Sequence, residues 1–161
     1  MTDEADPRVL APGTAPTPFT AEEIREGSRG GKAIRVRIEI AGEEPLFRQN
    51  RYLDVDEEGA TLERTQVTLD GTPTGEPKSE RVTWRELQAH ASFPDERTAV
   101  EEERIDTPMG ELDCLRYAVT EGTLEKVFWF ATSLPGMPVR TVTCSDGEVV
   151  MTVTMLSNTA G

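Results

Sequence analysis

His90 is the one histidine of the 161-residue chain, so a catalytic triad or dyad that depends on an imidazole must use it. Ser92 and Asp95 follow it closely and supply two further residue types of a hydrolase. Three polar side chains at the end of a predicted helix more commonly cap the helix and hydrate the following loop, and we favour that interpretation. A hydrolase centred on His90 is therefore the third of three functional hypotheses, and no catalytic residue is predicted.

Residues that ligate metals are few and scattered. One histidine and two distant cysteines cannot supply the three or four ligands of a zinc site. The acidic run from Glu101 to Glu103, together with Asp106, offers oxygen ligands for calcium or magnesium. Arg104 interrupts this run, and neighbouring side chains on a strand point to opposite faces of the sheet. We predict a solvated strand face, with no metal and no cofactor.

The two cysteines, Cys114 and Cys144, lie on two predicted strands and do not form a Cys-x-x-Cys pair. Free cysteine is commonly buried and packs as a small hydrophobic residue, so we interpret both as reduced, half-buried thiols. A disulfide between neighbouring strands is the alternative if the protein is exported.

The charge of the chain restricts its partners. With 17 basic and 30 acidic side chains the net charge is −13, which repels the phosphates of nucleic acids and anionic lipid headgroups. No apolar run approaches the roughly 20 residues of a membrane span, and the acidic N-terminus has no apolar signal segment behind it. These features predict an acidic, soluble, cytoplasmic protein that binds no nucleic acid.

The stretch from Gly110 to Leu156 predicts four consecutive antiparallel strands. Pro135 and Gly136 fit a type II turn, and the pair Asp146 and Gly147 is a strong hairpin signal. The last strand places four apolar side chains on one face, which we expect to be core: Val149, Met151, Val153 and Met155. The four predicted strands span Glu111 to Thr120, Leu124 to Ala131, Val139 to Cys144 and Glu148 to Leu156.

The first half of the chain predicts further strands. Lys32 to Ile40 alternates between apolar and charged residues, which is typical of a half-buried strand. Leu46 to Val55 and Ala60 to Leu69 alternate less cleanly, and Asp70 to Glu80 is expected to be a loop. Thr98 to Ile105 is charged and offers little apolar content.

Two short helices are predicted by the same local pattern. Thr20 and Glu23 form a capping box, and the helix that they begin should end at about Glu26. The segment from Val82 to Leu87 repeats this pattern and predicts a second helix from about Trp84 to Ala91.

The predicted fold class is α+β, mostly β. We expect a single antiparallel, strongly curved sheet of about 8 or 9 strands, an open or closed barrel, with the two short helices. Residues 1–18 are rich in proline and predict a flexible N-terminal tail, followed by a single β-rich domain over residues 19–157.

The order strand, Leu-Pro-Gly turn, strand, Asp-Gly turn, strand resembles the half-open β-barrels of lipoprotein-carrier-like domains and related uncharacterised bacterial families. The likeness covers roughly Lys32 to Leu156. Such carriers hold acyl chains against the concave apolar face of a curved sheet, and the resemblance implies the same use here. The residues that carry the likeness are Gly110 to Cys114, Tyr117, Trp129, Phe130, Leu134 to Val139 and Gly147.

The first functional hypothesis is a non-catalytic module that binds a small apolar ligand or a protein partner through the concave face. The large apolar residues of the late strands have few partners of matching bulk, which predicts a pocket beneath the second helix. From the net charge of −13, we expect a neutral or cationic ligand. The alternative is an assembly subunit that uses its N-terminal tail. The expected lining is Trp84, Leu87, Phe128, Phe130, Met151 and Met155.

Overall fold

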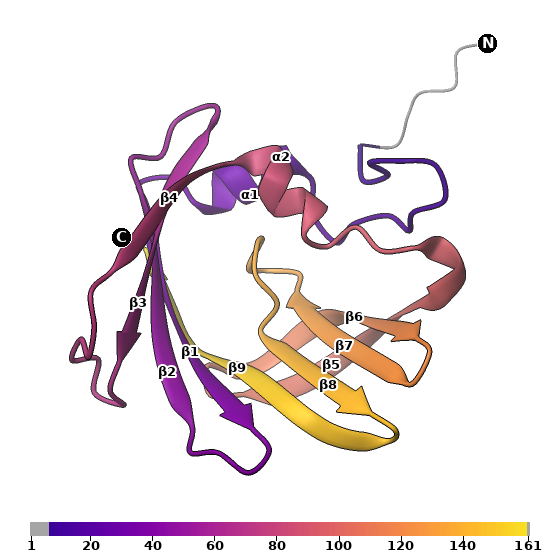
Figure 1. Ribbon diagram of the computed structural model, residues 1–161. Helices are drawn as coiled ribbons and strands as arrows, with labels where there is room; N and C mark the ends of the chain where they lie inside the picture. The colour runs from indigo at the N-terminus through magenta and orange to yellow at the C-terminus, as the bar shows by residue number, and fades with distance from the viewer. Residues whose placement is uncertain (1–6, 161) are drawn as a thin grey trace.

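The computed structural model describes residues 7–160, which form one antiparallel sheet of nine strands with two short α-helices on one of its faces (Figure 1). The order of the strands across the sheet is β4-β3-β2-β1-β9-β8-β7-β6-β5. The helices are α1 (Ala21–Gly27) and α2 (Trp84–Ala89), with a short 3-10 helix at Asp95–Arg97. The strands are β1 (Lys32–Ile40), β2 (Leu46–Leu53), β3 (Gly59–Val67), β4 (Lys78–Thr83), β5 (Thr98–Thr107), β6 (Gly110–Glu121), β7 (Leu124–Ala131), β8 (Arg140–Ser145) and β9 (Glu148–Ala160).

The sheet bends where β1 meets β9, so that it has two arms, β1–β4 and β5–β9 (Figure 1). Its edge strands β4 and β5 do not pair with each other. The predicted single antiparallel sheet with two short helices is confirmed, and of the two alternatives, open or closed, the sheet is open. It is not strongly curled, which corrects the expected curvature. We call the face on which α1 and α2 lie the inner face.

Bulges in β9 account for the bend. The pairing of β1 with β9 shifts register between Arg35 and Val36, and the pairing of β8 with β9 shifts between Thr143 and Cys144. A bulge inserts an extra residue and bends the strand that carries it. It also breaks the strict alternation of side chains, so Met155 is 1% exposed whereas Val149 is 56% exposed. The prediction that one face of β9 is apolar core throughout is therefore wrong at Val149, the first of its four residues.

The strand β4 was not predicted, because the sequence predicts a loop over Asp70 to Glu80. Residues Lys78 to Arg81 are all charged or polar and exposed, so they show no apolar alternation. They pair only with β3, as the edge of the sheet. A solvated edge strand is held by backbone hydrogen bonds and needs no apolar face, so its sequence carries little signal.

Both helices begin at the predicted capping boxes. The hydroxyl of Thr20 accepts a hydrogen bond from the Glu23 N–H, and the Glu23 carboxylate accepts one from the Thr20 N–H. Thr83 and Glu86 repeat this arrangement at α2. This reciprocal bonding satisfies two of the free N–H groups at each helix start.

The segment before α1 lies against the domain. Ala15 and Thr17 are 2% and 1% exposed, and the Tyr117 hydroxyl donates a hydrogen bond to the Pro16 carbonyl at 2.7 Å. The Gln88 side chain on α2 donates to the Pro7 carbonyl and to the Thr17 hydroxyl. Part of the predicted flexible tail therefore contacts α2 and β6, whereas residues 1–6 of it lie outside the described residues.

Cys114 and Cys144 are free thiols, Cys114 buried and Cys144 half-buried. They lie on β6 and β8, which are separated by β7, so the interpretation as reduced thiols is confirmed. Burial is the main cause that raises the pKa of the Cys114 thiol, which keeps it in its neutral form.

Candidate functional site

A cavity of about 230 Å³ lies beneath α2, between the two arms of the sheet. Its walls come from α1, α2, β2, β7 and the loop that joins β7 to β8. The wall is mostly apolar, with the Tyr52 hydroxyl and the His90 imidazole as its polar side-chain groups. The residues that line the cavity are Ile24, Tyr52, Leu87, His90, Ala91, Phe128, Phe130, Gly136, Met137 and Pro138.

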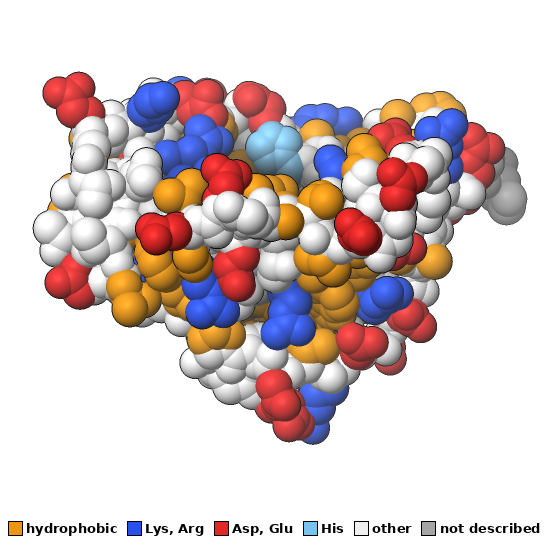
Figure 2. Space-filling view, turned by 60° about the horizontal axis from the view of Figure 1, so that its bottom comes forward, with side chains coloured by type: hydrophobic (Ala, Val, Ile, Leu, Met, Phe, Trp, Pro, Cys, Tyr) orange, Lys and Arg blue, Asp and Glu red, His pale blue; other side chains and the backbone are white. Residues whose placement is uncertain are grey.

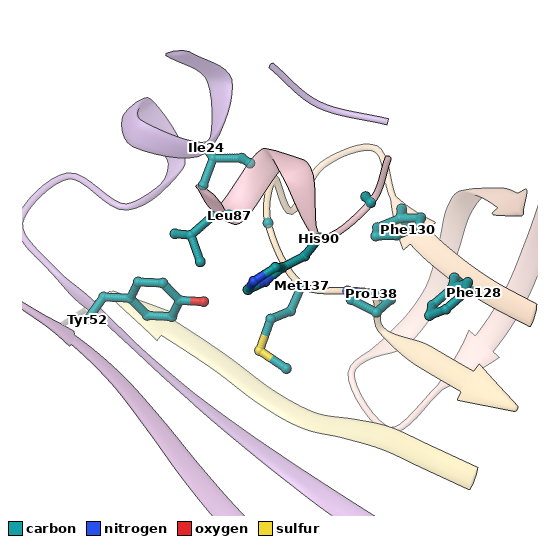
Figure 3. Close-up of a pocket in the computed structure, with 10 residues that line it drawn as sticks. Ile24, Tyr52, Leu87, His90, Phe128, Phe130, Met137 and Pro138 are labelled. Atoms are coloured by element: carbon teal, nitrogen blue, oxygen red, sulfur yellow. The ribbon is translucent and has the colours of Figure 1, made fainter. Parts of the chain in front are cut away.

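The side chains of the cavity converge from opposite sides (Figure 3). Leu87 and Ile24 point down from the helices, while Phe128 and Phe130 close the far side from β7 (Figure 3). The Tyr52 hydroxyl points across the cavity toward His90 (Figure 3). Tyr52 is 3% exposed, and burial raises its pKa to about 12, so this hydroxyl stays protonated and can donate a hydrogen bond at neutral pH.

An aromatic cluster fixes the β7 side of the cavity. The ring of Phe93, which follows α2, stacks on Phe128 with centroids 4.9 Å apart. Tyr117 and Phe19 both contact Phe130 edge to face, at 5.4 and 6.4 Å. Edge-to-face and offset pairs of this kind add stability beyond the area that they bury. This wall is therefore the rigid side of the cavity.

The loop from Leu134 to Val139 forms the floor between the arms and is held from both sides. On one side the Lys32 ammonium donates a hydrogen bond to the Pro135 carbonyl at 3.0 Å. On the other, the Val139 N–H donates to the Trp129 carbonyl at 2.7 Å. Because Lys32 is itself buried, this contact fixes the loop from within the protein.

The structure brings together three of the six predicted site residues: Leu87, Phe128 and Phe130 line the cavity. Trp84 is buried at the start of α2, and its indole N–H donates to the Asp56 carbonyl instead. Met151 and Met155 do not line this cavity, because β9 places Met155 in the core and leaves Met151 half-buried. That these residues bind a ligand stays a prediction.

Sequence reasoning missed several lining residues. Met137 and Pro138 were considered only for the turn and for the resemblance, and Tyr52 only as part of a strand that alternates less cleanly. Tyr52 is in phase with the polar Arg48 and Asn50, so the sequence of β2 carries no apolar alternation that would have identified it. Ile24 lies at the position of a hydrophobic staple with Phe19, and its contribution to a cavity was not predicted.

His90 caps the end of α2, which agrees with the interpretation of this polar group as a helix end. Ser92 and Asp95 donate backbone hydrogen bonds to the carbonyls of Ala89 and Gly13. Over residues 7–160 no hydrogen bond joins the side chain of either residue to His90. In the same part of the chain no three metal-ligating side chains cluster.

Apolar side chains gather around His90 on the surface drawn in Figure 2, and Lys and Arg side chains lie between them. Acidic side chains are spread around this region (Figure 2). Basic and acidic side chains are thus interspersed on this surface, with His90 among them (Figure 2).

Within residues 7–160, no helix combines the length and the apolar composition required to cross a membrane.

Comparison with known proteins gives a limited result. No protein family model matches the chain, and no curated protein matches it by sequence. Among solved structures, a LolA superfamily protein from Nitrosomonas europaea matches with a TM-score of 0.27 and 10% identity, over 89% of this chain and 94% of that one. At this TM-score and identity the match supports no conclusion about ligand or activity.

Proposed function

We propose that this chain is a non-catalytic module that holds a small apolar ligand in the cavity beneath α2. The observation that carries the proposal is the cavity itself, which is walled by apolar side chains from five separate parts of the chain. Ligand sites are typically concave and mostly apolar, with a few polar groups that orient the ligand. Tyr52 and His90 fit that role, because both are side chains of the cavity wall.

The size of the cavity restricts the ligand. Its volume of about 230 Å³ is below the roughly 300 Å³ at which typical small-molecule pockets begin. A single alkyl chain or a small ring compound suits this space better than a bulky ligand. Met137 lies on the wall, and the flexible side chain of methionine adapts to ligands of varied shape.

The test is binding of the neutral probe N-phenyl-1-naphthylamine, whose fluorescence rises in an apolar environment. Replacing Leu87 by Trp fills the cavity from α2 and should weaken probe binding at least about tenfold. The matched control is Leu69→Trp, because Leu69 is 69% exposed and does not line the cavity. Equal binding by wild-type and both variants would place the probe elsewhere and remove the support for the proposal.

The hypothesis of a hydrolase centred on His90 can also be tested, because His90 lines the same cavity. If a screen detects hydrolysis, His90→Ala should abolish it while the far-ultraviolet circular dichroism stays unchanged.

The assembly hypothesis is tested by a pull-down that compares the full chain with one lacking residues 1–18. Since residues 7–18 contact the domain, a partner that binds them would first have to displace them.

A further inference from the structure

The inner face of the β1–β4 arm carries a row of polar and cationic side chains that leads away from the cavity. Arg48, Asn50 and Tyr52 alternate along β2, so their side chains share one face of the sheet. Register pairs Asn50 with Ile34 and Arg48 with Val36, and these two β1 residues are 0% and 1% exposed. The row therefore lies on the face that the core covers.

Asn50 connects this row to the cavity. Its side-chain nitrogen lies 3.3 Å from the sulfur of Met137, which lines the cavity. Asn50 is 3% exposed, and its Oδ1 is buried without a hydrogen-bond partner. A buried amide oxygen without a partner loses its hydrogen bonds to water without replacement, so folds usually avoid it. Such a group beside a cavity points to a ligand that completes its hydrogen bonds.

Arg48 is the cation next along the row. It is half-buried, its Nε is buried without a partner, and within residues 7–160 no ion pair joins it to a carboxylate. Burial and, to a smaller extent, the nearby charge of Arg64 lower the pKa of Arg48. Arg64 lies across from Asn50 on β3 and bonds to Glu80 at 2.9 Å.

We propose that the ligand of the cavity is a single-chain amphipath with a carboxylate head, which binds Arg48 beside Asn50 while its alkyl chain fills the cavity. The proposal rests on the proposed function and specifies its ligand. On a strand that rises about 3.3 Å per residue, Arg48 and Tyr52 are about 13 Å apart, a span that a medium-length alkyl chain can cover. A guanidinium recognises a carboxylate with two parallel hydrogen bonds.

This inference reverses the expectation of a neutral or cationic ligand. That expectation came from the net charge of −13, which sets the field at a distance from the protein. At contact distance in a partly dry site, the nearest charges decide, and salt screens the distant ones. Lys32, Arg48 and Arg64 are cations on the inner face of this arm, and Glu80 is the carboxylate that pairs with Arg64. Within residues 7–160 no ion pair joins Lys32 or Arg48 to a carboxylate.

The experiment compares three ligands that share one chain and differ in the head: decanoate, decanol and decyltrimethylammonium. Binding to the full chain is measured by isothermal titration calorimetry below the concentrations at which these compounds form micelles. We expect decanoate to bind about tenfold more tightly than decanol, because its carboxylate makes one charge-assisted hydrogen-bonded pair that the hydroxyl of decanol does not make. Decyltrimethylammonium should bind most weakly.

Substitution of Arg48 tests the assigned residue. Arg48→Gln should remove the preference for decanoate while leaving the affinity for decanol unchanged, and Arg48→Lys should keep part of the preference. The matched control is Arg51→Gln, because Arg51 lies on the same strand but on the opposite face, where it pairs with Glu63. Arg51→Gln should keep the full preference.

The outcomes separate this inference from the proposed function. If none of the three compounds binds, the apolar module fails and the inference fails with it. If all three bind equally, or if decyltrimethylammonium binds most tightly, the module stands and the carboxylate head is overturned. If Arg48→Gln does not fold, two measurements on the wild-type chain still test the carboxylate head. These are the order of affinities for the three ligands and the loss of the preference for decanoate when salt is added.

Discussion

The two arms of one sheet use their inner faces in opposite ways. On the β5–β9 arm the inner face is aromatic, and the chain covers it with its own Phe19 and Phe93. On the β1–β4 arm the same face carries Lys32, Arg48 and Asn50, with polar groups that lack protein partners. The β5–β9 arm therefore forms the aromatic part of a core to which the buried Ile34 and Val36 of the β1–β4 arm also belong. The β1–β4 arm keeps buried polar groups at a cost, which is expected of a surface selected for binding.

The largest expected effect comes from a substitution in the aromatic cluster of the β5–β9 arm. Phe130 is 3% exposed and contacts Phe19, Tyr117 and Phe128. Phe130→Ala should lower the free energy of unfolding by about 3–5 kcal/mol, measured by urea denaturation, because it removes a buried ring and leaves a cavity.

The control for this variant is Leu69→Ala, at a side chain that is 69% exposed. It should change the free energy of unfolding by less than about 0.5 kcal/mol. Similar losses in both variants would contradict the view that this arm holds the core.

The second expected effect is a dependence of stability on pH that comes from Lys32 on the β1–β4 arm. Burial lowers the pKa of Lys32 from 10.5 to about 8. Between these values the unfolded chain binds more protons than the folded chain, so stability rises with pH. The contribution of Lys32 to the free energy of unfolding should increase by about 2 kcal/mol between pH 8 and pH 10.

Other groups act in the opposite direction at the upper end of this range. Burial raises the pKa of Tyr52 and of Tyr117 to about 12, so above pH 10 the unfolded chain loses these protons first and stability falls. Burial also raises the pKa of Cys114. The difference between wild-type and Lys32→Met isolates the lysine, and parallel pH profiles of the two proteins would contradict the prediction.

The third effect exchanges a polar group of the β1–β4 arm for an apolar one. Asn50→Leu removes the buried oxygen that has no partner and keeps a side chain of similar shape. It should raise the free energy of unfolding by about 1 kcal/mol, or the melting temperature by about 3 °C, in differential scanning calorimetry.

A matched substitution is Gln49→Leu, on the outer face of the same strand, which should have little effect. Destabilisation by Asn50→Leu would mean that the amide serves the fold, and would weaken the contrast between the arms.

The smallest expected effect comes from removing the Glu80 carboxylate from the β1–β4 arm. The ion pair of Arg64 with Glu80 is exposed, and exposed pairs contribute little. Glu80→Gln should cost about 0.5 kcal/mol or less in unfolding while strengthening decanoate binding slightly, since it frees a second guanidinium near Asn50. Unchanged or weaker decanoate binding would place the head away from Arg64.

Much of the local structure follows from the sequence, because the interactions that define it lie within a few residues. Both capping boxes join residues three positions apart, so the starts of α1 and α2 follow from composition and spacing. The pair Asp146 and Gly147 adopts positive φ values of 52° and 80°, as a two-residue hairpin turn requires. Neither feature depends on the rest of the fold.

Features that depend on distant pairing were predicted less well. The polar strand β4 exists because β3 offers it backbone hydrogen-bond partners, and nothing in its own side chains signals a strand. The bulges in β9 change which residues face the core, and they are visible only in its pairing with β1 and β8. Met151 and Met155, two of the three predicted site residues that fall outside the cavity, lie on this strand.

The sequence by itself determined the two helix starts, most strands, the hairpin turns and the net charge of −13. Only the tertiary structure decided where that charge lies relative to the cavity. Composition adds charges without regard to position, whereas the register of β1, β2 and β3 places Lys32, Arg48 and Arg64 on one face of the sheet. Electrostatic energy falls with distance and rises as water is excluded, so the proposed preference for a carboxylate head follows from this local arrangement and not from the net charge.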